Sequence, residues 1–169
     1  MIKKYLFSVL VIVFSFVFVN GVQAAEPTTY KAAILMVNFP DNLTHIWSMQ
    51  TAGNTLTEIG NFHNENSYGN VIIEGGVADV YGVYTISRTC DASGITAQAR
   101  DAAMLAGVDL SSYDILIPVG SFDCNWKGVY VPGAVAAIPN KQVIAHEMAH
   151  LFGLSSHANF LNCGLVPLA

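Results

Sequence analysis

Two short runs of apolar residues constrain the fold of this chain most. Residues 31–38 read KAAILMVN and residues 115–119 read ILIPV, and both runs are bounded by polar or turn-forming residues. A continuous apolar run of this length is typical of a strand that is buried, whereas a half-exposed strand alternates apolar and polar residues. We therefore expect both runs to be buried strands, and the second one fits a parallel sheet.

Helical and shorter extended patterns separate the two runs. Helices are predicted over 51–66, 95–106 and 141–152; the first has apolar side chains at Leu56, Ile59 and Phe62, and the last is capped by Asn140 and ends at Gly153. Residues 71–73 and 77–86 are predicted as antiparallel neighbours joined by a turn at Gly75-Gly76. Two short strands are predicted at 128–131 and 134–138, around Pro132-Gly133. This order of elements indicates an α/β fold.

The N-terminal 24 residues have the pattern of a secretory signal peptide. Lys3 and Lys4 precede an apolar run over 5–19, and Val22-Gln23-Ala24 offers small residues where a signal peptidase cleaves. The run is about 15 residues long, which is short for a membrane span of roughly 20. We expect cleavage after Ala24, a secreted or periplasmic protein with no stable membrane anchor, and one domain over 25–169.

The charge of the mature chain excludes some partners. Removing Lys3 and Lys4 leaves five of the seven basic residues against twelve acidic ones. Nucleic acid is therefore not expected as a partner, because a net negative chain is not attracted to phosphates. Among the three cysteines, Cys90 and Cys124 lie beside predicted turns and could form a disulfide, which leaves Cys163 over.

The segment HEMAH at 146–150 carries the candidate chemistry. His146 and His150 are four residues apart on a predicted helix, so their imidazoles face the same side and suit zinc. Glu147 lies beside the metal site, where it can take a proton from a water that zinc activates. A chance H-E-x-x-H has a likelihood of roughly half a percent at this composition. The histidines at positions 45 and 63 are interpreted as solvated.

His157 is the candidate third ligand. No Asp or Glu follows Glu147 in this sequence, which excludes an acidic third ligand unless the chain once ran on. The remaining downstream candidates are His157 and, more remotely, Cys163. Gly153 can adopt a positive φ and turn the chain back towards the metal. A tyrosine near the zinc could also assist in the transition state, but the sequence does not select one.

Four stretches together resemble the metzincin zinc peptidases, and more narrowly the gametolysin-like metallopeptidases. They are ILMVNF at 34–39, NSYGNV at 66–71, TCDASGITAQARDAA at 89–103 and HEMAHLFGLSSHANFLNCG at 146–164. The resemblance implies that His146, His150 and His157 bind zinc and that Glu147 is the general acid/base. It also implies a twisted sheet with one antiparallel edge strand within 128–138, along which a peptide or protein substrate lies.

The family signature places its third histidine one residue earlier, and the family continues to a Met-containing turn below the zinc. Here all five methionines precede His150. We therefore expect an upper subdomain over 25–153 and a truncated lower subdomain over 154–169. The primary hypothesis is a secreted zinc endopeptidase, and the alternative is a non-catalytic remnant that keeps the fold and binds metal or peptide.

Overall fold

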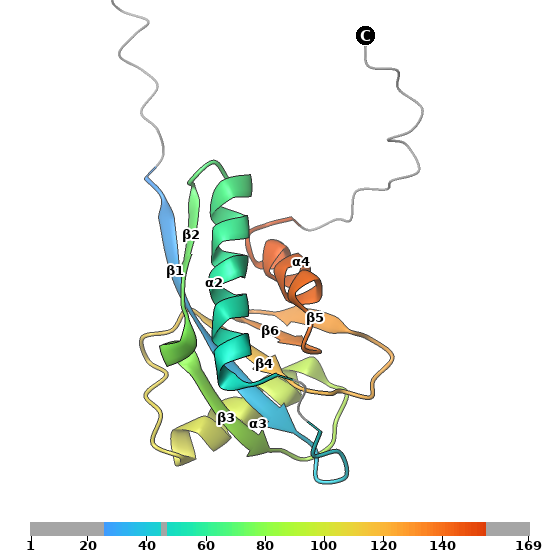
Figure 1. Cartoon of the computed structure of the whole chain (residues 1–169). Helices are drawn as coiled ribbons and strands as arrows, with labels where there is room; N and C mark the ends of the chain where they lie inside the picture. Colours follow the sequence, from blue (N-terminus) through green and yellow to red (C-terminus); the bar gives the residue numbers. More distant parts are fainter. Residues whose placement is uncertain (1–25, 45–46, 155–169) are drawn as a thin grey trace, which may run out of the picture.

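The computed structural model describes residues 26–44 and 47–154, which form an α/β fold (Figure 1). The strands are β1 (Thr28–Asn38), β2 (Val71–Glu74), β3 (Val80–Thr85), β4 (Ile115–Val119), β5 (Gly128–Val131) and β6 (Ala134–Ala137). The helices are α2 (Met49–Asn66), α3 (Ala92–Leu105) and α4 (Lys141–Leu151), and a short 3-10 turn, η1 (Val77–Asp79), precedes β3. The predicted fold class and both predicted buried strands are confirmed.

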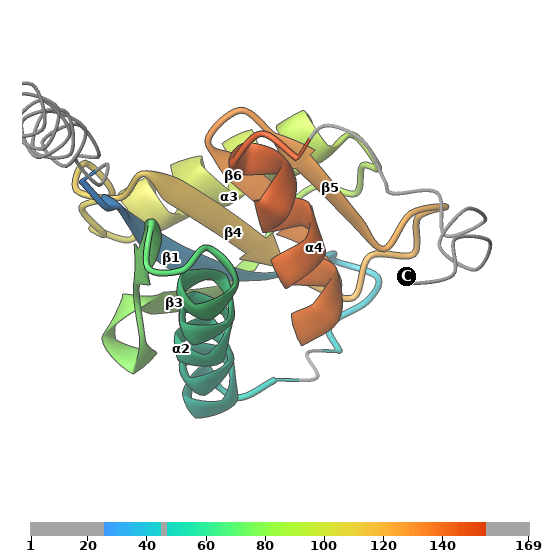
Figure 2. The ribbon, with the colours of Figure 1, turned by 90° about the horizontal axis from the view of Figure 1, so that it is seen from above.

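The strands form one mixed sheet in the order β2-β1-β4-β6-β5, and β3 also pairs with β1. β1, β4 and β6 are parallel to one another, whereas β5 is antiparallel to β6. The antiparallel strand expected within 128–138 is therefore β5, and it lies at one edge of the sheet. This edge is the one nearest α4 (Figure 2).

The hairpin expected over 71–86 is absent from the structure, and that prediction was wrong. β2 pairs with the first half of β1 and β3 with the second half, both in parallel, so the chain does not reverse between them. Gly76 is extended (φ −167°), and its N–H donates to the Asp79 side chain at 3.0 Å, which forms η1. The chain therefore continues in the same direction through Gly75 and Gly76, from β2 to β3, and does not reverse.

Helices cover both faces of the sheet, which explains why the central strands are apolar throughout. Ala32, Ile34 and Met36 of β1 pack in a core cluster that includes residues of α2 and α4. The alternate residues Leu35 and Val37 pack in a second cluster with residues of α3. In Figure 2, α2 and α4 lie side by side on one face and α3 lies on the other. A strand with two buried faces has no solvent-exposed side and needs no polar alternation.

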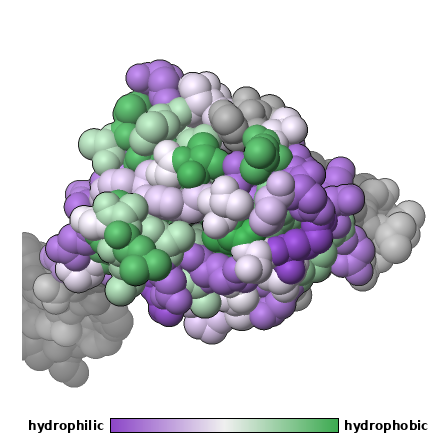
Figure 3. All heavy atoms as spheres, turned by 90° about the horizontal axis from the view of Figure 1, so that it is seen from below, coloured by the Kyte–Doolittle hydropathy of each residue, from purple (hydrophilic) through white to green (hydrophobic). Residues whose placement is uncertain are grey.

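A disulfide joins Cys90 to Cys124. It links the segment before α3 to the loop before β5, as the sequence suggested; Cys163 lies outside the described residues. On the face shown in Figure 3, hydrophobic side chains form separate patches among polar ones. Over 26–44 and 47–154, none of the helices has both the length and the apolar character that crossing a membrane requires.

Candidate metal centre

α4 is defined by local signals at both ends. The Asn140 side chain accepts a hydrogen bond from the N–H of Val143 at 3.0 Å and caps the first turn. Gly153 has φ +94°, a conformation that glycine adopts at little cost, and ends the helix. Ile144 and Met148 are buried against the sheet. His146 is exposed and His150 is half-buried, so both candidate ligands lie on the side of α4 that faces away from Ile144 and Met148.

The rings of His146 and His150 lie close together, with centroids 5.1 Å apart and planes at 87°. A nitrogen held roughly 2.0–2.1 Å from zinc puts its ring centre about 3.2 Å from the ion, so two rings at a tetrahedral angle have centres about 5.2 Å apart. The observed separation agrees with this value. The distance between the two rings on α4 therefore permits a shared zinc ion.

A contact at the end of α4 orients the second of these rings. Nδ1 of His150 hydrogen-bonds the carbonyl oxygen of Leu154. A carbonyl oxygen only accepts, so Nδ1 carries a proton in this contact, and Nε2 is the ring nitrogen left to bind a metal. Histidine ligands commonly donate their second ring N–H to a backbone carbonyl in this way. The turn at Gly153 thus helps to set the tautomer of His150.

Glu147 points from α4 to the edge strand. Its Oε2 accepts a hydrogen bond from the backbone N–H of Tyr130 at 3.2 Å. The contact depends on Gly128, because a Cβ there would lie 2.5 Å from Cγ1 of Val143 and 2.8 Å from Cγ of Glu147. A side chain at position 128 would therefore force β5 and α4 apart. Glu147 is half-buried in this contact.

The outer edge of β5 presents backbone groups beside Glu147. The carbonyl of Lys127 accepts from the N–H of Ile138, so Lys127 faces β6. In an antiparallel strand, successive residues direct their N–H and C=O groups to opposite sides. Gly128 and Tyr130 therefore direct their backbone groups to the outer edge, which is consistent with the bond from Tyr130 to Glu147. A hollow lined by Gly128, His146 and Glu147 lies next to this edge.

His157, the expected third ligand, lies outside the described residues, as does His45. Over 26–44 and 47–154, no group of three His, Cys, Asp or Glu side chains could hold a metal ion. The structure thus brings together His146, His150 and Glu147. It does not place the third ligand.

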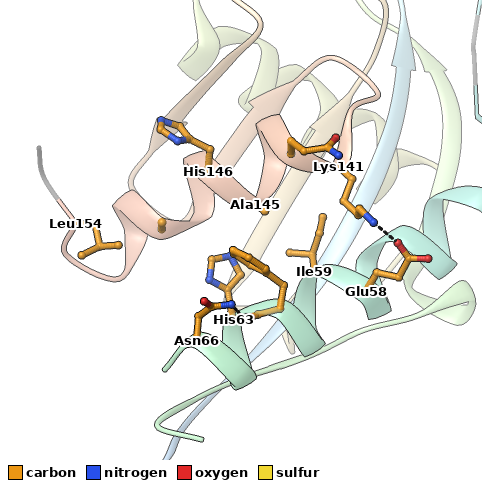
Figure 4. Close-up of a pocket in the computed structure, with 11 residues that line it drawn as sticks. Glu58, Ile59, His63, Asn66, Lys141, Ala145, His146 and Leu154 are labelled. Atoms are coloured by element: carbon orange, nitrogen blue, oxygen red, sulfur yellow. Dashed lines mark hydrogen bonds and ion pairs between the residues drawn. The ribbon is translucent and has the colours of Figure 1, made fainter. Parts of the chain in front are cut away.

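Three residues near the site were not selected from the sequence. The ring of Tyr130 lies 5.2 Å from that of His150 and Tyr130 is 45% exposed, so a tyrosine lies beside the candidate metal site. Gly128 has no Cβ and therefore leaves the space that the side chain of Glu147 occupies. His63, expected to be solvated, is only 7% exposed, and that expectation was wrong. It packs edge-on against Phe62 and Phe152. In Figure 4, the ring of His63 lies on the side of α2 that faces α4.

Comparison with known proteins adds no assignment. No protein-family model matches this sequence, and no curated protein matches it. The functional assignment therefore depends on the residues of α4 and on their geometry.

Proposed function

We propose that this chain is an exported, zinc-dependent endopeptidase of metzincin type, similar to the gametolysin-like metallopeptidases, which hydrolyses peptide bonds in protein or peptide substrates. One observation carries the proposal. Two imidazoles at a separation that suits zinc stand beside a carboxylate that reaches the antiparallel edge strand of the sheet. The sheet order, with β5 at the edge next to α4, supports the finer family assignment.

The roles follow from the chemistry of the side chains. His146, His150 and His157 would hold the zinc ion, which supplies a Lewis acid and lowers the pKa of a water to about 7. Glu147 takes a proton from the attacking water and delivers it to the nitrogen of the departing amine. Its position favours this role because its carboxylate lies between α4 and the strand on which the substrate is expected to bind. Tyr130 could donate a hydrogen bond near His150.

The substrate would bind as an additional strand on β5. The outward N–H and C=O of Gly128 and the outward C=O of Tyr130 can pair with an extended peptide. The N–H of Tyr130 already bonds Glu147, so a peptide at this edge lies within reach of the carboxylate. This arrangement supports an endopeptidase, because edge pairing uses the peptide backbone and needs no free chain end.

The test is peptide cleavage by the purified mature protein, with and without the substitution Glu147→Ala. We expect cleavage to fall by about a hundredfold to ten-thousandfold, the range typical of general acid/base residues, while zinc binding is retained. Glu65→Ala, an exposed position on α2, is the matched control and should leave cleavage unchanged. Cleavage that survives the loss of Glu147 contradicts the proposal.

The same experiment distinguishes the endopeptidase proposal from the alternative hypothesis. The alternative is a non-catalytic protein that keeps the fold and binds zinc or peptide. Such a protein would bind zinc and show no turnover before any substitution. Measurable turnover by the unsubstituted chain eliminates this alternative.

A further inference from the structure

An open pocket lies between α2 and α4, beside the candidate metal centre. Its volume is about 570 Å³. Its walls are mainly apolar and include Ile59 and Phe62 of α2, Ala145 and Ala149 of α4, and Leu154 (Figure 4). Phe62 is 51% exposed and Leu154 is 63% exposed. Apolar surface gathered in one concave site usually meets a partner.

The wall of the pocket includes a histidine with a buried polar atom that lacks a partner in the described part of the chain. Nε2 of His63 is buried and makes no hydrogen bond within residues 26–44 and 47–154. His63 is 7% exposed and contributes to the pocket wall. Buried polar side-chain atoms are nearly always hydrogen-bonded in native proteins, because an unpaired one costs about 1–3 kcal/mol. An occupant that brings both apolar side chains and a hydrogen-bonding group therefore suits this pocket.

The segment that follows Leu154 has this chemistry. Residues 155–169 read SSHANFLNCGLVPLA; they include no Asp, Glu, Lys or Arg, and their large apolar residues are Phe160, Leu161, Leu165, Val166 and Leu168. Leu154 is itself a wall of the pocket, so this segment begins at the pocket. Phe160 is six residues further on, a distance that an extended chain spans in about 20 Å. The segment can therefore return to the pocket without straining the chain.

We propose that residues 155–169 occupy the pocket between α2 and α4, with Phe160 against Ile59 and Phe62 and a polar group of the segment bonded to Nε2 of His63. A tethered segment has an effective concentration in the millimolar range, which favours it over a second copy of the chain in dilute solution. His157 lies midway between Leu154 and Phe160, so this docking also holds it near α4. The inference does not depend on zinc or on peptidase activity.

Cys163 provides a direct test in the full chain. Asn66→Cys places a thiol on the pocket wall, and Met104→Cys, exposed on α3 on the opposite face of the sheet, is the matched control. Under mild oxidation we expect Cys163 to form an intrachain disulfide with the thiol introduced at position 66 about ten times faster than with the thiol introduced at position 104, as a locally raised effective concentration predicts. Adding Phe160→Ser should remove most of this difference. Peptide mapping by mass spectrometry identifies the pairs.

Equal rates for the two introduced thiols, or no effect of Phe160→Ser, would overturn the proposal. Disulfides between two chains would overturn it in favour of a second copy as occupant. Binding of a hydrophobic dye provides a check that needs no added cysteine: Phe160→Ser with Leu161→Ser should raise dye fluorescence several-fold, and an unchanged signal counts against docking. Zinc content is measured separately on the same samples, so failure of this inference is distinguishable from failure of the proposed function.

Discussion

His146 and Glu147 are adjacent in the chain, but α4 directs them to different partners. Each residue of an α-helix is rotated by about 100° from the one before it. His146 therefore meets the ring of His150, four residues later, while Glu147 reaches the backbone of Tyr130 on β5. At the residue scale, the candidate centre depends on the different directions of the His146 and Glu147 side chains. It also depends on Gly128, which has no side chain to displace Glu147.

Replacing Gly128 with alanine tests the packing of Glu147. The new Cβ would lie within 3 Å of Val143 and Glu147, so we expect the carboxylate to shift, cleavage to fall about tenfold or more, and unfolding free energy to fall by about 1–3 kcal/mol. Gly76→Ala is the control, because a Cβ there would meet only Oγ1 of Thr57, at 3.6 Å. Peptide cleavage and chemical denaturation measure both effects. Equal effects of the two substitutions would contradict the assigned contact.

His63 predicts a pH dependence of stability. Burial lowers the pKa of its imidazole below the ordinary value of 6.5, and the backbone of Ala145 opposes this shift only in part. Below pH 6.5 the unfolded chain binds a proton that the folded chain excludes, so stability falls as pH drops from 6.5 towards the lower folded pKa. Denaturation of the metal-free protein between about pH 7.5 and 5 should show this loss. His63→Gln should lose less stability over the same range; an identical slope would contradict the assignment.

The burial of His63 shows that the sequence pattern of α2 predicted the helix correctly but did not identify all of its buried residues. The spacing of Leu56, Ile59 and Phe62 correctly indicated a helix, but it assigned the wrong residue to the buried face. A helix of 3.6 residues per turn returns to the same face at Leu56, Ile59 and His63, and Phe62 is half-exposed. A strict helical period would have placed His63 inside.

At the element scale, predictions succeeded where one local signal fixes the chain direction. Asn140 and Gly153 bound α4 as expected, because a side-chain cap and a positive-φ glycine act within a single turn. The Gly75-Gly76 pair was misinterpreted as a hairpin turn. Its conformation depends on close packing against Ala32 and Leu56, and these lie far away in sequence. Glycine allows a reversal but does not require one.

Gly153 can be tested against a glycine of similar conformation. Gly153 and Gly107 have φ of +94° and +85°, and an added Cβ would meet nothing within 4 Å at either site. Alanine at each position should therefore cost about 1 kcal/mol of stability through backbone conformation alone. Only Gly153→Ala should also weaken zinc binding, because this turn leads the chain from α4 towards His157. Calorimetry with zinc measures the difference, and equal zinc affinities would contradict this role of the turn.

At the scale of the whole molecule, the site combines elements that the sequence does not show to be neighbours. The HEMAH segment predicted His146, His150 and Glu147 together because one helix carries all three. Tyr130 and Gly128 join them only because β5 lies next to β6 at the sheet edge and α4 packs across both strands. Such contacts depend on strand order, and no local pattern encodes it. The Cys90–Cys124 disulfide, which closes a long loop, stabilises this arrangement by about 3–4 kcal/mol in the chain-entropy model.

The most direct test of the central claim is the zinc affinity of the purified chain, measured by competition with a chromogenic chelator. We expect one zinc ion per chain, with affinity reduced at least about a hundredfold by His146→Ala and by His157→Ala, since each removes a ligand from the site. His45→Ala, which removes a histidine outside the proposed ligand set, should leave the affinity unchanged. A chain that binds no zinc, or that binds it equally well without His157, would contradict the account.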